Sequence, residues 1–138
     1  MKELRKILLI EDNADQRLII SRQLSAHQLL VTQADSGEAG VALAAEQKPD
    51  IILLDIMMPG QDGIKTYQAL RQNAATQSIP VIFLTALAPD KSFTKYSLEL
   101  LAFTKHGYRI DGKFAVIGKT GSPEDLLRDV QKAWSELA

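Results

Sequence analysis

The sequence contains no cysteine, so disulfide bonds and thiol chemistry are excluded, and a reducing compartment fits the chain. Its two histidines, His27 and His106, have no partners at metal-ligating spacing, which leaves no histidine or cysteine zinc site. No apolar run reaches the length of a membrane span, and the first one is short and ends in acids, unlike a signal peptide. We therefore expect a cytoplasmic protein without membrane association.

The chain also has little net charge. The formal net charge is −1, so nothing in the overall balance favours nucleic acid or an acidic membrane as partner. The last helical pattern runs to the C-terminus, and we expect no direct nucleic-acid binding within this chain. A length of 138 residues with 46% hydrophobic residues predicts one domain, 1–138, with its own core.

Short apolar runs alternate with segments of helical period along the whole chain. Fully apolar runs that alternate with helices are typical of a parallel sheet covered by helices on both faces. We therefore predict an α/β fold whose ligands gather at the carboxyl ends of the strands. The predicted strands are 6–10, 29–34, 51–55, 81–85 and 113–118, and the predicted helices include 15–26, 36–46, 63–72 and a last helix from Pro123.

The helical segments carry signals for their ends and for their buried faces. Ser36 is the expected N-cap of the second helix, and Pro123 fits the first turn of the last one. In the first helix Leu18, Ile19 and Leu24 predict the apolar face. A longer stripe predicts the buried face of the last helix: Leu127, Val130, Trp134 and Leu137.

Polar groups follow four of the buried strands, and this pattern indicates a site. Glu11 and Asp12 follow the first strand, Asp55 ends the third, Thr85 ends the fourth and Lys119 follows the fifth. Each residue alone is typical of a turn, a helix cap or the surface. Together they would place three carboxylates, a hydroxyl and an ammonium at one edge of the sheet. Oxygen ligands without histidine suit Mg²⁺, and an aspartate can act as a nucleophile toward phosphorus.

Three motifs, LLIEDN, DIMMPGQDG and FLTA, followed by Lys119, make the sequence resemble the receiver domain of bacterial two-component response regulators. The resemblance covers nearly the whole chain. It implies a flavodoxin-like, doubly wound, five-stranded parallel sheet in the order 2-1-3-4-5. It also implies that Asp55 accepts a phosphoryl group from the phosphohistidine of a histidine kinase.

The same resemblance implies the other site residues. Asp12, Asp55 and the main-chain carbonyl of Met57 would bind Mg²⁺ directly, with Glu11 acting through water. Thr85 and Lys119 would hold the phosphoryl oxygens. The chemistry would then rest on positioning and electrostatics.

These residues predict a single-domain response regulator, not an enzyme. At most, the regulator would catalyse its own phosphorylation and dephosphorylation. Its partners would be a histidine kinase or phosphotransfer protein, an unknown downstream protein, and a second copy through the helix 4/strand 5/helix 5 face. The alternative is a receiver-like binding module that phosphorylation does not switch. A phosphohydrolase with an aspartate nucleophile usually needs a second acid two residues later, where this chain has Met57.

The chain departs from the family pattern near its fifth strand. Thr120 replaces the usual proline after the lysine, so we expect a trans Lys119–Thr120 bond and an altered loop. Val116 stands where the family often has an aromatic residue, with Phe114 two positions earlier. Gly118-Lys119-Thr120 is not a P-loop, because the required glycine position holds Lys113.

The segment at about 86–114 is longer than its family counterpart by roughly ten residues, about three helical turns. It holds most of the phenylalanine and tyrosine residues of the chain. It fits either a lengthened fourth helix that buries its own stripe, or a docking or dimerisation surface.

Overall fold

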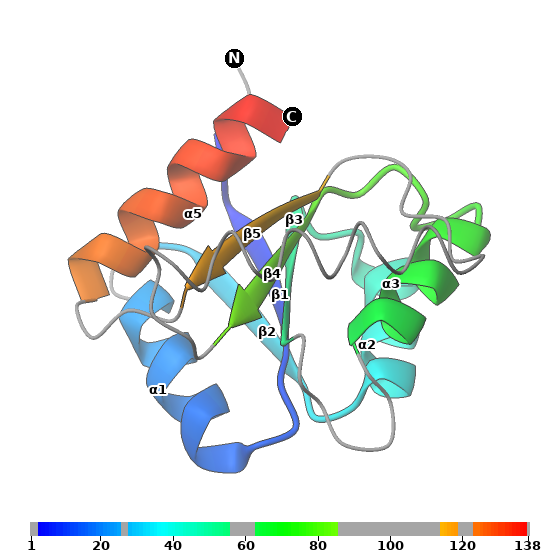
Figure 1. The fold of residues 1–138 in the computed structure, drawn as a ribbon, viewed down its shortest axis with the longest axis horizontal. Coiled ribbons are helices and arrows are strands. Elements are labelled where there is room, and N and C mark those ends of the chain that lie inside the picture. Colours follow the sequence, from blue (N-terminus) through cyan, green and yellow to red (C-terminus); the bar gives the residue numbers. More distant parts are fainter. Residues whose placement is uncertain (1–2, 26–27, 56–62, 86–113, 119–122, 138) are drawn as a thin grey trace.

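The structure is a computed structural model that describes residues 3–25, 28–55, 63–85, 114–118 and 123–137 (Figure 1). Strands and helices alternate over the described residues up to 85, as the sequence predicts. The strands are β1 (Lys6–Ile10), β2 (Leu30–Ala34), β3 (Ile51–Asp55), β4 (Val81–Thr85) and β5 (Phe114–Gly118). The helices are α1 (Ala14–Ser25), α2 (Gly37–Gln47), α3 (Gly63–Gln72) and α5 (Pro123–Leu137).

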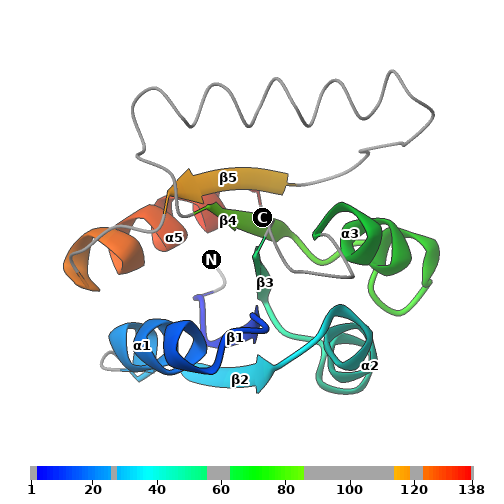
Figure 2. The same cartoon turned by 60° about the horizontal axis from the view of Figure 1, so that its bottom comes forward.

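All five strands form one parallel sheet in the order β2-β1-β3-β4-β5. Helices α1 and α5 cover one face of this sheet, and α2 and α3 cover the other (Figures 1 and 2). The predicted doubly wound, five-stranded α/β fold is therefore confirmed.

The central strands are buried on both faces over most of their length, which explains why they are apolar at nearly every position. Alternate residues of one strand point to opposite faces, so β1 supplies a residue to each of two cores in turn. Leu8 and Ile10 pack in the core under α2 and α3, with Tyr67 and Phe83. The core under α1 and α5 contains Ile7, Leu9, Ile20, Leu24, Leu126, Leu127 and Val130, among others.

The predicted helix signals are confirmed at α2 and α5. Ser36 adopts an extended conformation before α2, and its side chain accepts a hydrogen bond from the Ala39 N–H. Pro123 begins α5. In that helix Leu127 and Val130 are buried, while Trp134 and Leu137 pack against the same core.

The predicted apolar face of α1 was partly wrong. Leu18 and Ile19 are 46% and 49% exposed, whereas Ile20 and Leu24 are buried. Three consecutive apolar residues fit more than one helical face. Packing against the sheet selects Ile20, because it lies one turn before Leu24.

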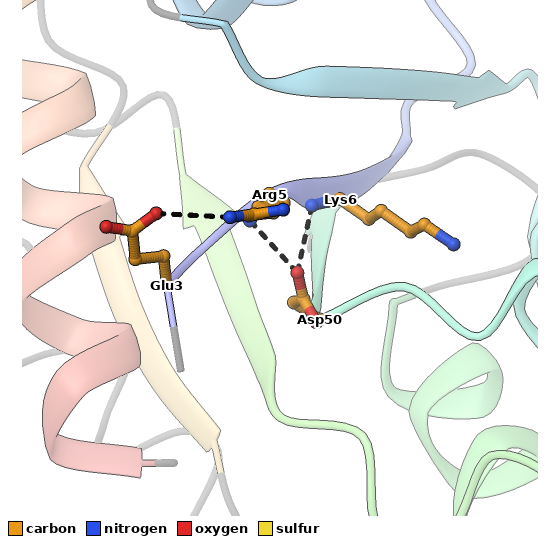
Figure 3. A network of polar contacts seen from close by, with 4 residues as sticks. All are labelled: Glu3, Arg5, Lys6 and Asp50. Atoms are coloured by element: carbon orange, nitrogen blue, oxygen red, sulfur yellow. Dashed lines mark hydrogen bonds and ion pairs between the residues drawn. The ribbon is translucent and has the colours of Figure 1, made fainter. Parts of the chain in front are cut away.

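At the amino-terminal ends of the strands, Asp50 joins β3 to the start of β1 (Figure 3). Its Oδ2 accepts hydrogen bonds from the N–H groups of Arg5 and Lys6, both at 3.0 Å. The Asp50 N–H donates in turn to the Lys6 carbonyl at 2.9 Å. These bonds fix the register of β1 and β3 at the edge of the sheet opposite to Asp55.

Several predictions concern residues outside the described ranges, namely His27, Met57, the 86–113 segment, His106, Lys119 and Thr120. The backbone of β5 is described, but the side chains of Phe114 and Val116 are not. Among the described helices, none combines the length and the apolar character that crossing a membrane requires.

Candidate functional site

The register of the sheet brings the acidic residues of two strands to the same edge. Ile10 and Leu54 are partners across β1 and β3, so the residues that follow them, Glu11 and Asp55, lie at the same level. Asp55 pairs in turn with Leu84 of β4. The parallel arrangement therefore delivers both carboxylates to the carboxyl edge without any contribution from a distant loop.

Glu11, Asp12 and Asp55 form one cluster at this edge. One ligand atom from each carboxylate lies within 4.8 Å of the others. Glu11 is 1% exposed and Asp55 is 8% exposed, whereas Asp12 is exposed. Asp55 is the last residue of a strand whose other four residues are fully buried, so its backbone is held by the core while its carboxylate reaches the edge.

The cluster suits a small, hard cation. All three groups that the described residues bring together here offer carboxylate oxygens, the ligand type that Mg²⁺ takes in proteins. Oxygens on opposite sides of one Mg²⁺ lie about 4.2 Å apart, which is close to the spread observed here. Three like charges, two of them buried, also repel one another unless a cation lies between them. The residues present therefore fit Mg²⁺.

The remaining predicted site residues are placed only in part. The backbone of Thr85 ends β4 and pairs with Gly118 of β5, which puts both strand ends at the same edge as Asp55. The side chain of Thr85 lies outside the described residues, as do Met57 and Lys119.

Two residues that support the acidic loop were missed in the sequence. Asn13 precedes α1, and its Oδ1 accepts a hydrogen bond from the Gln16 N–H at 2.9 Å. Arg17 donates from Nη1 to the carbonyl of Glu11 at 2.8 Å. The spacing of Asn13 and Gln16 is a capping-box signal that could have been recognised. The contact of Arg17 has no such signal, because its acceptor is a main-chain carbonyl.

Comparison with known families gives a match over most of the chain. The model of the response regulator receiver domain family matches residues 7–104. Protein PilH of Pseudomonas aeruginosa is 39% identical over 80 residues, which cover 58% of this chain and 66% of PilH. Response regulator PleD of Caulobacter vibrioides is 39% identical over 82 residues, 59% of this chain and 18% of PleD. The aligned part thus spans less than two thirds of either curated relative.

Solved structures share the fold. The chemotaxis protein CheY4 of Vibrio cholerae has a TM-score of 0.75 at 24% identity, covering 95% of this chain and 99% of that one. The receiver domain of sensor histidine kinase PA1611 of Pseudomonas aeruginosa has a TM-score of 0.73 at 25% identity, covering 96% and 99%. Its structure holds a magnesium ion in the active site cleft. With the family match over residues 7–104, these findings show that the chain belongs to the response regulator receiver domain family, the phosphoryl-accepting switches of two-component signalling.

Proposed function

We propose that this chain is a Mg²⁺-dependent phosphoacceptor whose nucleophile is Asp55. The observation that carries the proposal is the position of Asp55. It ends a fully buried strand and shares its edge with the carboxylates of Glu11 and Asp12. A rigid backbone with a carboxylate at the edge is the arrangement that in-line attack on phosphorus requires.

In the proposed reaction a carboxylate oxygen of Asp55 forms a bond to the phosphorus of a phosphohistidine. The phosphorus–nitrogen bond breaks, and its electron pair stays on the imidazole nitrogen. Bound Mg²⁺ would supply charge neutralisation for the phosphoryl oxygens. Asp12, Asp55 and the Met57 carbonyl would hold it directly, with Glu11 acting through water.

Thr85 and Lys119 are the proposed donors to the phosphoryl oxygens. Thr85 is the last residue of β4 and pairs with Gly118 of β5. In the sequence, Lys119 directly follows Gly118. A hydroxyl and an ammonium provide hydrogen bonds and positive charge for the phosphoryl group.

The partners belong to the same proposal. A histidine kinase or phosphotransfer protein would supply the phosphoryl group. The phosphorylated chain would signal by binding a downstream protein or a second copy through the helix 4/strand 5/helix 5 face. We also propose that 1–138 is a single receiver domain, with the segment at about 86–114 as an extension.

Intact mass spectrometry after incubation with a small phosphodonor tests the proposal. Wild-type protein with Mg²⁺ should gain the mass of one phosphoryl group, and the gain should be absent without Mg²⁺ and in Asp55→Asn. Asp35→Asn is the matched control, because Asp35 directly follows β2 at the same edge, is exposed and lies outside the cluster. This control should be phosphorylated like wild type. A wild-type chain that gains no mass would instead support the unswitched binding module.

A further inference from the structure

The loop between β1 and α1, residues Glu11 to Asn13, is held from three directions. The Glu11 N–H donates to the carbonyl of Ala34, at the end of β2, at 3.0 Å. Asn13 caps α1 through its side chain, as described above. The third support is the guanidinium of Arg17. This loop carries two of the three clustered carboxylates, so its geometry determines where they lie.

Arg17 reaches the loop because of its place on α1. It lies one turn before the buried Ile20 and Ser21 and two turns before Leu24, on the inward side of the helix. It is itself half-buried. From there Nη1 lies 2.8 Å from the Glu11 carbonyl oxygen and 3.4 Å from the Asp12 carbonyl oxygen.

These two carbonyls belong to the peptide groups on either side of the Asp12 Cα atom. Fixing both peptide planes fixes both backbone dihedrals of Asp12, because a residue has only φ and ψ as soft variables. The direction of the Asp12 side chain then follows from its backbone. The shorter bond, to Glu11, is the stronger of the two.

We propose that Arg17 is a positioning residue for the acidic cluster, which holds the Asp12 carboxylate in place for a divalent cation. This inference rests on the proposed Mg²⁺ site but assigns a role to a residue outside it. In the described part of the chain, Arg17 acts on this site through the main-chain carbonyls of Glu11 and Asp12.

The charge of Arg17 and its positioning role predict opposite changes in Mg²⁺ affinity when the residue is replaced. A guanidinium near the cluster repels a cation, so removing its charge alone would tighten Mg²⁺ binding. Loss of positioning would weaken it. The sign of the change in affinity therefore separates the two effects.

The test measures Mg²⁺ affinity by calorimetry in wild type, Arg17→Gln and Arg17→Lys. Arg17→Gln should bind about tenfold more weakly, the lower end of the effect expected when support behind metal ligands is removed. Arg17→Lys keeps the charge but replaces the planar guanidinium, whose Nη1 lies near both carbonyl oxygens, with a flexible ammonium. It should therefore also bind more weakly than wild type.

Arg71→Gln is the matched control. Arg71 also joins a helix to main-chain carbonyls, donating to Ile79 at 2.8 Å and Thr76 at 3.5 Å, but in the segment before β4. This variant should lose stability and keep its Mg²⁺ affinity within about twofold. Amide hydrogen exchange without metal gives an independent reading. Arg17→Gln should exchange the Glu11 amide faster, and Arg71→Gln should not.

Three outcomes would contradict the positioning role of Arg17. Equal or tighter Mg²⁺ binding by Arg17→Gln overturns the positioning role. Equal weakening by Arg71→Gln also overturns it, because general destabilisation would then explain the effect. If wild type itself binds no Mg²⁺, both this inference and the proposed metal site fail.

Discussion

Gly40 in α2 lies directly against Ile10, the last residue of β1, and leaves no room for a side chain between them. A Cβ atom at position 40 would lie 2.6 Å from Ile10 Cγ1, and closer still to Cδ1. Both residues are buried, so neither can move into solvent. Since Ile10 directly precedes Glu11, this contact also supports the strand that carries the acidic cluster.

Gly40→Ala should therefore destabilise the protein, by about 1–3 kcal/mol, because added volume in a packed core forces neighbours to shift. Helix propensity alone predicts the opposite, a gain of about 1 kcal/mol. Urea unfolding measures the difference. The double variant Gly40→Ala/Ile10→Val removes the nearest atom, Cδ1, and should recover part of the loss. A more stable Gly40→Ala protein would show that the close approach does not limit position 40.

The N-cap of α2 gives a second prediction about stability. Ser36→Ala removes the acceptor that satisfies the Ala39 N–H at 3.1 Å and should lower the free energy of unfolding by about 1 kcal/mol. Ser135→Ala is the control, since Ser135 is exposed and its hydroxyl donates to the Lys132 carbonyl within α5. Equal effects of the two substitutions would argue against a capping role for Ser36.

The sheet could be predicted from the sequence because β1, β3 and β4 are buried at nearly every position and therefore read as unbroken apolar runs. In a parallel sheet, the ends of such runs lie at one edge. Glu11, Asp12 and Asp55 could thus be grouped from the sequence, and in the structure one ligand atom from each lies within 4.8 Å of the others.

The first helix shows where sequence reasoning fails. Leu18, Ile19 and Ile20 are chemically similar, and only packing against the sheet decides which one is buried. The contact between Arg17 and Glu11 was also out of reach, because its acceptor is a backbone carbonyl, which every residue has. This contact depends on the backbone conformation of the loop between β1 and α1, which the amino-acid sequence does not reveal directly.

Substitutions of Asp50 test how the opposite edge of the sheet contributes to stability. Asp50→Ala removes the acceptor of the Arg5 and Lys6 N–H groups and should lower the free energy of unfolding by about 1–3 kcal/mol. Asp50→Asn keeps an oxygen and should lose less. Because Asp50 and Asp55 lie at opposite ends of the β3 region, Mg²⁺ affinity of the folded variants should stay at the wild-type value. A parallel loss of affinity would mean that this edge determines the geometry of the acidic cluster.

Replacing Asp12 separates two consequences of the three clustered carboxylates, namely charge repulsion without metal and the binding of Mg²⁺. Without metal, Asp12→Asn should raise the melting temperature by a few degrees, because it removes one of three mutually repelling charges. With Mg²⁺ at about a hundred times its dissociation constant, wild type should gain about 2.7 kcal/mol of stability, and Asp12→Asn should gain much less. The two proteins should therefore exchange their order of stability when Mg²⁺ is added. Thermal melts with and without Mg²⁺ measure this, and Asp35→Asn, whose carboxylate lies outside the cluster, should follow wild type. If Asp12→Asn gains as much from Mg²⁺ as wild type does, the Asp12 carboxylate is not a ligand.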